Sequence, residues 1–523
     1  MIQKRIISIT KVSIFFVYGI LVTLVSCTKD YTSINTDKNS IASISDSDIP
    51  FLFTAALESV RIGDQTAQNL FADQYSQFIA NNATYFPTDR LFIRMNWARN
   101  NFNPIYTGVV PQLRTIFEYT DEDSAENAMA QIWWVYTFHR VTDYWGPIPY
   151  SEAGTAEGSV PYDSQEDIYN DFFVRLAAAT AVLNNHVSET PYGSFDVIYG
   201  GDVGKWVKFA NTLRLRLALR VSRVAPELAR QQAEAAYEGG VFVQSPDDDA
   251  LLEKNLIDFN RLSQMSEWFE FNMSATMESI LKGYSDPRIE EYFMPSEETG
   301  TYEGMRNGLS VAQLNLPENT AAYNSHIGPR WSNPSRGGWP DYFSTPQNVM
   351  CTAEAYFLRA EGAVLGWNMG GTAEELYEEG IRNSMAQWGI TDINAIDAYI
   401  NGVDLPIPPE DYLNSPPAAE VPVKFNTSDI TVQKTQIAIQ KWLAVFPDGN
   451  EGWAEYRRNH DLFPFYPVAN SDNPDIPDPT ANWIRRIPFL DGEKETNGDE
   501  VQKAISLLGG EDKISTPLWW DVH

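Results

Sequence analysis

The stretch VMCTAEAYFLRAEGAVLGWNMGGTAEELYEEGIRNSMAQW, residues 349–388, shows most directly how this chain folds. Thr372 and Glu375 have the spacing of a capping box, and Gly371 lies just before them. The stretch therefore predicts two helices, over about 348–366 and 372–388, joined by a short turn. Their apolar faces are predicted from residues at three- and four-residue steps: Val349, Ala353, Phe357 and Ala360, then Leu376, Tyr377, Gly380, Ile381, Ser384 and Trp388.

The same helical spacing recurs earlier in the chain. It predicts a pair over 101–119 and 125–142, and another over 164–185 and 203–224, whose apolar faces include Trp133 and Trp206. Small residues followed by Tyr or Trp recur in these pairs, which loosely resembles tetratricopeptide repeats. The predicted fold class is therefore all-α, a tetratricopeptide-like helix-pair scaffold with a loop-rich binding lobe. Asp163 with Glu166 has the capping-box spacing too.

Long segments rich in Pro, Gly, Asn and aromatic residues separate the predicted helices. Loops of this length in a helical protein are usually functional or form a second lobe. We therefore expect a body over 48–523 with two parts. The scaffold is expected over about 48–240 and 345–460, and the binding lobe over about 241–344 and 461–523. The loop segments themselves are 81–100, 284–347, 402–436 and 460–523.

The first residues have the layout of a bacterial lipoprotein signal. Basic Lys4, Arg5 and Lys11 precede an apolar run, residues 12–25, which ends in Leu-Val-Ser-Cys at Cys27. The run is short and no second one follows, as in a signal peptide rather than a spanning helix. We expect a signal peptide over 1–26, an acylated Cys27 and a flexible tether over 27–47. The alternative is ordinary secretion, in which Cys27 has no role in anchoring the protein.

The charge of the chain narrows the choice of partners. The formal net charge is −32 at pH 7, from 70 acidic and 38 basic residues among 523. Such a charge repels nucleic acid and anionic lipid surfaces, so neither is expected as a partner, and it favours a neutral ligand. Once Cys27 is acylated, Cys351 is the only remaining thiol, and no disulfide within the chain is expected.

No motif for catalysis is found in the sequence. The five histidines are scattered, and the chain has no His-Glu-x-x-His, Cys-x-x-Cys, Gly-x-Ser-x-Gly or phosphate-loop pattern. We therefore expect no catalytic residues, no metal and no cofactor. Asp247-Asp248-Asp249 is a weak candidate for a cation, because acidic clusters in so acidic a chain are usually solvated turns. A glycosidase needs only two carboxylates and leaves no local motif, so it stays an alternative.

Aromatic residues in the loops are the positive signal for a binding site. Aromatic faces stack on the apolar faces of sugar rings, while Asn, Asp and Arg hydrogen-bond to the hydroxyls. Packing of these rings onto the scaffold is the plainer alternative for each of them. The predicted ligand-binding residues come from 81–100 and 284–347, and they are Tyr85, Phe86, Asn96, Trp97, Tyr323, Asn324, Arg330, Trp331, Trp339 and Asp341.

Several motifs, spread in order over nearly the whole chain, resemble those of the SusD/RagB-like nutrient-binding outer-membrane lipoproteins. The first two are Ile34-Asn-Thr-Asp-Lys-Asn39 and the ten residues YWGPIPYSEA from Tyr144 to Ala153. The others are Asp286-Pro-Arg-Ile289, Ala353 to Glu361, Gln440-Lys-Trp442, Trp453 to Arg458 and Pro517 to Asp521.

The resemblance implies four tetratricopeptide-like helix pairs below a loop-rich binding lobe, and no catalysis. It implies a lipid-anchored protein of the cell outer membrane that captures oligosaccharides and delivers them to a SusC-like TonB-dependent transporter. Ligand contacts in this family come from variable loops, so none can be transferred by motif. Surface-displayed members often have several acidic residues after the cysteine. This chain departs from that pattern, with Thr28-Lys29-Asp30 there, and the orientation that we expect is toward the extracellular side.

Two alternatives to glycan capture remain open. One is a surface glycoside hydrolase with an α-helical body, which an assay of reducing-sugar release separates from a binding protein. The other is a peptide-binding lid of the same family, and no residue in the sequence decides between peptide and sugar.

Overall fold

The computed structural model describes residues 44–155, 158–333, 339–463 and 465–522, with only the backbone at 339–340. Residues 1–49 and 50–523 are two separate units. In the first, the Ser45 backbone N–H donates to Asp48 Oδ2 at 2.9 Å. The predicted signal peptide, Cys27 and most of the tether lie outside the described residues. Within them, no helix combines the length and the apolar character that a membrane crossing requires.

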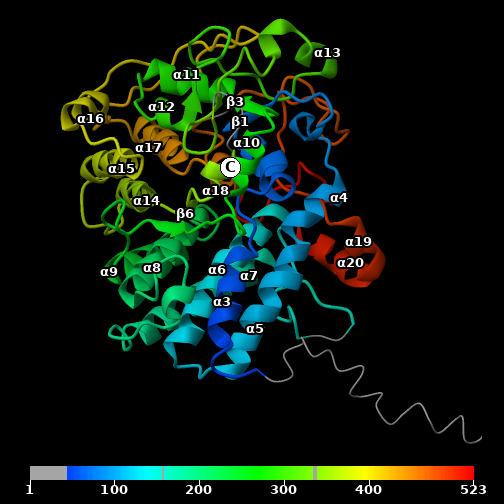
Figure 1. The fold of residues 1–523 in the computed structure, drawn as a ribbon, viewed down its shortest axis with the longest axis vertical. Coiled ribbons are helices and arrows are strands. Elements are labelled where there is room, and N and C mark those ends of the chain that lie inside the picture. Colours follow the sequence, from blue (N-terminus) through cyan, green and yellow to red (C-terminus); the bar gives the residue numbers. More distant parts are fainter. Residues whose placement is uncertain (1–43, 156–157, 334–338, 464, 523) are drawn as a thin grey trace, which may run out of the picture. The chain divides into compact units, whose positions relative to one another are not determined.

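Residues 50–523 are mostly helical (Figure 1). The α-helices are α3 (Ile49–Glu58), α4 (Met95–Ala98), α5 (Val110–Tyr119), α6 (Ala125–Trp145), α7 (Gln165–Leu183), α8 (Val203–Arg220), α9 (Pro226–Glu238), α10 (Arg261–Ser266), α11 (Ala275–Gly283), α12 (Ile289–Tyr292), α13 (Val311–Leu314), α14 (Thr352–Val364), α15 (Ala373–Gln387), α16 (Ile393–Ile400), α17 (Ile430–Ala444), α18 (Gly449–Arg458), α19 (Asp491–Thr496) and α20 (Gly498–Leu507). Shorter 3-10 or π-helical segments are η1 (Gln65–Asp73), η2 (Thr88–Arg90), η3 (Arg99–Asn101), η4 (Ile105–Val109), η5 (Gly193–Phe195), η6 (Pro317–Asn319) and η7 (Trp339–Tyr342).

The helix pairs predicted from the sequence pack side by side. Helix α5 packs against α6, α7 against α8, and α14 against α15. The mostly helical fold class is thus confirmed. The sequence analysis missed α9, which packs against α8. The predicted division of the body into scaffold and lobe stays a prediction.

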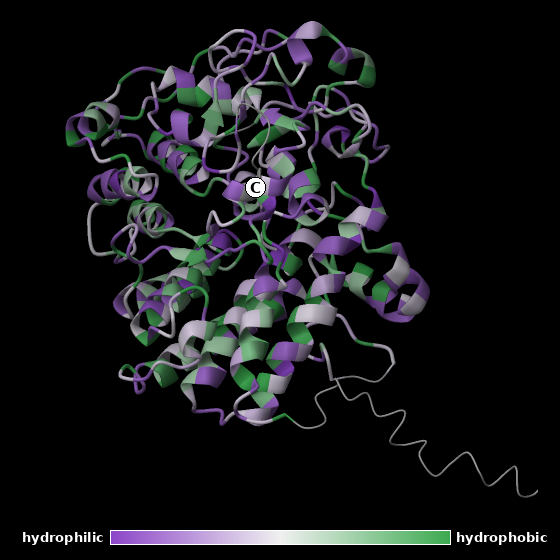
Figure 2. Ribbon diagram, viewed as in Figure 1, coloured by the Kyte–Doolittle hydropathy of each residue, from purple (hydrophilic) through white to green (hydrophobic). Residues whose placement is uncertain are grey.

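Helix α6 forms the centre of the scaffold. All its side chains are buried except those of Glu126 and Gln131, which are partly exposed. Figure 2 shows hydrophobic and hydrophilic residues mixed along the helices, as expected where each helix packs by one stripe.

The predicted start of one helix is wrong by a residue. Ser164, not Asp163, caps α7, and its side chain accepts a hydrogen bond from the Asp167 backbone N–H. Asp163 instead accepts from the Tyr150 and Ser151 N–H groups. The Thr372–Glu375 capping box is confirmed at α15.

Three short antiparallel strand pairs join segments that are far apart in sequence. They are β1 (Ile79–Asn81) with β3 (Phe271–Met273), β2 (Ala250–Leu252) with β6 (Gln347–Met350), and β4 (Phe293–Met294) with β5 (His326–Ile327). In the first pair Ile79 lies opposite Met273. Figure 1 labels β1 and β3 in its upper part and β6 near its middle.

A buried network of charges joins α6, α8, α14, α17 and α18. Arg216 donates two hydrogen bonds to Glu354, at 2.7 and 2.6 Å. Glu451 accepts from Arg220 at 2.5 Å and from Lys441 at 3.1 Å. Buried charges are tolerated only when they are paired and hydrogen-bonded, so the network fixes how these helices meet.

Candidate ligand-binding site

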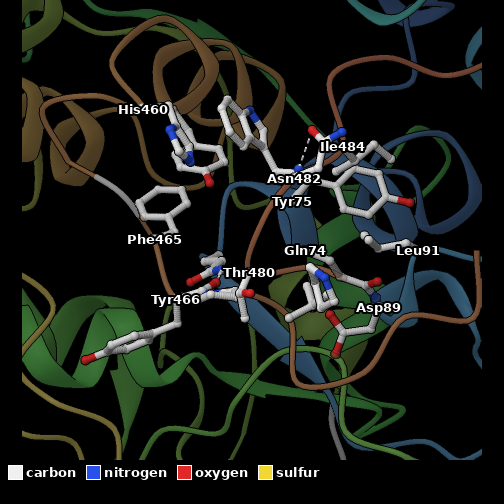
Figure 3. Close-up of a pocket in the computed structure, with 16 residues that line it drawn as sticks. Gln74, Tyr75, Asp89, Leu91, His460, Phe465, Tyr466, Thr480, Asn482 and Ile484 are labelled. Atoms are coloured by element: carbon white, nitrogen blue, oxygen red, sulfur yellow. Dashed lines mark hydrogen bonds between the residues drawn. The ribbon is translucent and has the colours of Figure 1, made fainter. Parts of the chain in front are cut away.

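A cavity of about 350 Å³ opens among loops that the helices support (Figure 3). Its walls come from the residues after η1, the loop that contains η2, the end of α18, and two loops of the C-terminal region. The lining residues are Gln74, Tyr75, Gln77, Asp89, Leu91, Tyr456, His460, Phe465, Tyr466, Pro467, Val468, Pro479, Thr480, Asn482, Trp483 and Ile484.

Two residues that line the cavity have strained backbone conformations. Gln77 and Leu91 have φ angles of 51° and 64°, although neither is a glycine. Such a conformation costs of order 1–3 kcal/mol and persists only where the surroundings hold it. Gln77 is held in part by its side-chain Nε2, which donates to the Tyr466 carbonyl at 2.6 Å. This hydrogen bond joins the wall after η1 to the C-terminal wall of the cavity.

Aromatic rings line several walls of the cavity. Tyr456 and Phe465 stack with centroids 4.0 Å apart, and His460 stacks on Trp483 at 3.4 Å. The Arg306 guanidinium lies 4.8 Å from the centroid of the Tyr466 ring. The rings are thus locked against one another before any ligand arrives, which reduces the entropy cost of binding.

Two polar groups of the lining residues lie behind the cavity surface without a hydrogen-bond partner in the described part of the chain, and another polar side chain, Asn482, lies in the same wall. Gln74 Nε2 and Tyr75 Oη are buried and have no hydrogen-bond partner among the described residues. Burial raises the pKa of Tyr75 well above its usual range, so its hydroxyl stays a donor. The Asn482 side-chain oxygen accepts from the Trp483 N–H at 2.9 Å, drawn as a dashed line in Figure 3. An uncharged ligand with oxygen acceptors suits such a site.

Asp89 connects this cavity to the protein interior. Its carboxylate accepts from Asn307 Nδ2 at 2.8 Å and from the Gly308 N–H at 3.0 Å. Burial outweighs these bonds and raises the pKa of Asp89 to about 6. Because both oxygens are already engaged, Asp89 holds the loop around η2 in place.

We predict a pH effect from Asp73, at the end of η1. Burial raises its pKa from 3.8 to about 7, although Gln68 donates to it at 2.8 Å. Between these values the folded state keeps a proton that the unfolded state has released. The free energy of unfolding therefore falls as the pH rises from about 4 to 7, by up to about 4 kcal/mol from this group.

Asp73→Asn removes that titration and is expected to stabilise the protein more at pH 8 than at pH 5. Urea unfolding at the two pH values measures the difference. The exposed Asp478→Asn variant serves as the control, because that carboxylate is not buried. An equal effect of Asp73→Asn at both pH values would contradict the raised pKa.

The structure brings three of the predicted ligand-binding residues together. Phe86 is buried and stacks on Phe271, and Trp97 meets the Phe86 ring edge to face at 5.7 Å. Tyr85 is 59% exposed, and its hydroxyl donates to Glu270. Asn96 is exposed and lies at a separate, open hollow between α4 and α19. None of these residues lines the cavity.

The other predicted residues lie elsewhere. Asn324 is buried, and its amide donates to the carbonyls of Glu318 and Thr320, at 3.0 Å each. Tyr323 beside it is partly exposed. Arg330 pairs with Glu291 at 2.7 Å. Asp341 is exposed, and the side chain of Trp339 is outside the described residues.

Trp331 is only 3% exposed, so its ring offers no face to a ligand in this conformation. It packs against Trp388 and Phe446, whose ring centroids are 5.6 and 5.9 Å from its own.

Two carboxylates of the Asp247–Asp249 cluster make contacts within the protein. Asp248 pairs with Lys208 at 2.7 Å, and Asp249 accepts from the Thr352 N–H at 2.7 Å. The described residues contain no group of three or more carboxylates, histidines or cysteines suited to a metal ion.

Sequence reasoning missed the cavity residues. Phe465, Tyr466 and Trp483 belong to 460–523, which the sequence marked as a long aromatic and proline-rich segment. The aromatic and proline-rich composition of this segment was the one signal in the sequence that could have located these cavity residues. The partners at Gln74 and Tyr75 are about 390 residues earlier, and no local pattern connects them.

Comparisons with known proteins agree on one family. A family model described as SusD-like, Susd and RagB outer membrane lipoprotein, matches residues 45–521. A chitin-binding SusD homologue from Flavobacterium johnsoniae is 33% identical, with a TM-score of 0.82, covering 91% of this chain and 99% of that one. A SusD homologue from Bacteroides uniformis is 30% identical, with a TM-score of 0.80, covering 92% and 100%. A chitin-binding protein is 26% identical, with a TM-score of 0.74, covering 91% and 100%. No curated protein matches.

The fold and the cavity together define a binding protein, with a rigid helical scaffold that supports loops and a cavity rich in aromatic residues. Specifically, the chain belongs to the SusD-like family of outer-membrane lipoproteins. Proteins of this family bind and do not catalyse, so the protein is not an enzyme. The resemblance inferred from the sequence motifs is confirmed.

Proposed function

We propose that the protein captures oligosaccharides at the outer membrane and passes them to a SusC-like TonB-dependent transporter. The aromatic cavity carries the proposal. Its aromatic rings suit the apolar faces of sugar rings, and polar side chains that line it, Asn482 and Thr480, suit the sugar oxygens. The negative charge of the chain also favours a neutral glycan.

Chitooligosaccharides are the first ligands to test, because two of the similar structures are chitin-binding proteins. The acetamido carbonyl of N-acetylglucosamine is a strong acceptor. It suits the side-chain amide of Asn482 and the hydroxyl of Thr480, which line the cavity and are partly exposed and exposed, respectively.

The loop that supplies Asp89 and Leu91 to the cavity also presents Tyr85 and Trp97. We retain these two rings, with Asn96 and Asp341, as proposed contacts for further sugar units of a longer chain. Their exposed or partly exposed side chains are available to a ligand without rearrangement of the core. Phe86, Asn324, Arg330 and Trp331 are secondary in this proposal, because they make contacts within the protein. Tyr323 and Trp339 stay predicted contacts.

The lipid on Cys27, the extracellular orientation and the transporter are part of the same proposal. An acyl chain on Cys27 would hold the body at the membrane while the tether lets it move over its partner. Mass spectrometry of the N-terminal peptide from native material tests the acylation. Co-purification with a β-barrel protein, lost after release of the lipid, tests the partnership.

We predict that Thr480→Trp abolishes glycan binding measured by calorimetry with chitohexaose. Thr480 is exposed at the cavity rim, and an indole there would fill the opening. Asn482→Ala is expected to weaken binding about 10-fold, the equivalent of roughly 1.4 kcal/mol. The matched control is Thr190→Trp, at an exposed site away from the cavity.

Unchanged affinity in Thr480→Trp would remove the cavity from the proposal. Cellohexaose and a peptide library in parallel show whether the ligand is an acetamido sugar, another glycan or a peptide. Release of reducing sugar by the purified protein, lost on substitution of one carboxylate, would favour the hydrolase alternative instead.

A further inference from the structure

A second, smaller pocket lies in the helical scaffold, where α8, α14 and α18 end. Its volume is about 260 Å³. No residue lines both this pocket and the aromatic cavity. The lining residues are Ser222, Arg223, Pro226, Glu361, Leu365, Trp367, Lys434, Asn459 and Leu462.

The pocket holds an unpaired positive charge. Lys434, on α17, makes no ion pair or hydrogen bond with any residue that the structure describes. Glu361 is already neutralised, because Arg458 donates two hydrogen bonds to it, at 2.5 and 2.6 Å. Arg223 pairs with Asp461 at 2.8 Å, where both side chains are partly exposed. A lysine without a partner is unexpected in a concave part of so acidic a chain, where carboxylates are abundant.

The same pocket offers an aromatic ring. Trp367 follows the end of α14, and its backbone N–H donates to the Gly362 carbonyl at 2.9 Å. A Cβ at position 362 would lie 2.7 Å from Met369 Cγ and 3.3 Å from Trp367 Cε3, so glycine lets both side chains lie close to the helix. Trp367 is partly exposed, with Leu365 and Pro226 in the same wall. A partly exposed indole beside amide, hydroxyl and cationic groups is a suitable arrangement for a sugar ring.

We propose that this pocket is a second ligand site, which binds a sugar unit carrying an anionic group, either a uronate carboxylate or a sulfate ester. Trp367 packs against the ring, Asn459 and Ser222 are near its hydroxyls, and Lys434 attracts the anion. A charge-assisted hydrogen bond from a cation to a carboxylate or sulfate is roughly twice as strong as a neutral one. The site goes beyond neutral-glycan capture in the cavity, and neither proposal depends on the other.

Binding of methyl β-glucuronide, glucose 6-sulfate and methyl β-glucoside to the purified protein, followed by ligand-observed NMR, tests the proposal. We expect the glucuronide or the sulfate, or both, to bind at least 10-fold tighter than the neutral glucoside. Which of the two binds tighter identifies the anion. Lys434→Met keeps the aliphatic stem and removes the charge, and it is expected to abolish that preference. The control is Lys503→Met, whose side chain is 70% exposed elsewhere.

Equal binding of the three sugars, or an unchanged preference in Lys434→Met, would overturn the proposal. Trp367→Ala is expected to weaken all three sugars, provided that circular dichroism shows an intact fold. Chitohexaose affinity is measured on the same variants and is expected to be unchanged. A loss of anionic-sugar binding with chitohexaose binding retained therefore reports on this pocket and not on the cavity.

Discussion

Glu451→Gln is expected to lower the free energy of unfolding by about 3–5 kcal/mol at pH 7, or to prevent folding. Glu451 lies between Arg220 at 2.5 Å, Lys441 at 3.1 Å and Arg216 at 3.5 Å. All four side chains are buried. Glutamine has nearly the same shape but no charge, so three buried cations would lose a shared counterion.

The same residue makes the protein sensitive to acid. Burial favours a higher pKa for Glu451, but the charges of Arg220, Arg216 and Lys441 outweigh it and hold the pKa well below the usual range. The stability that Glu451 contributes is therefore present above its unfolded pKa, near 4.5, and is lost as the pH falls toward its folded pKa. Urea unfolding between pH 3 and 8 is expected to show a smaller loss in Glu451→Gln than in the parent, because Glu455 and Asp143, whose pKa values are also lowered, still titrate in the variant.

The matched control is Glu511→Gln. Glu511 pairs with Lys513, but its side chain is 74% exposed. An exposed pair contributes about 0–1 kcal/mol, so the expected change is small. If the two glutamine variants had similar stability, the buried network would not be what fixes the helices together.

Trp331→Ala is the second change with a large expected effect. Truncating a buried tryptophan costs about 3–5 kcal/mol, because the free energy gained by burying the ring is lost and a cavity remains in its place. Trp331 packs on Trp388 and Phe446, and its neighbour Ser332 is fully buried. We therefore expect a large drop in thermal stability, and any loss of glycan affinity to follow from unfolding.

Trp97→Ala serves as the contrasting variant. Its ring is partly exposed and lies under the Arg94 guanidinium, 4.7 Å from the ring centroid. We expect it to melt within a few degrees of the parent and to bind long chitooligosaccharides more weakly. Calorimetry and thermal melts on both variants separate the two roles. A stable Trp331→Ala protein with reduced affinity would instead place Trp331 in the binding site.

The helices were largely predictable because their signals are local. Apolar residues at three- and four-residue steps located α6, α8, α14 and α15, and the Thr372–Glu375 cap was predicted from its spacing. Helix α9 was missed, since its short side chains Ala229, Ala233 and Ala236 make a weak apolar stripe. The start of α7 was misplaced because Asp163 and Ser164 are both good caps, and contacts from Tyr150 and Ser151 decided between them.

What the sequence by itself determined is the helical class, the family and the binding rather than catalytic character, since these depend on periodicity and on motifs within single segments. Only the tertiary structure decided which aromatic side chains are accessible. Trp331 and Tyr85 look alike as loop aromatics, yet one is buried by Trp388 and Phe446 and the other is exposed. The cavity joins Tyr75 to Trp483 across some 400 residues. Exposure and convergence depend on long-range packing, and no local pattern encodes them.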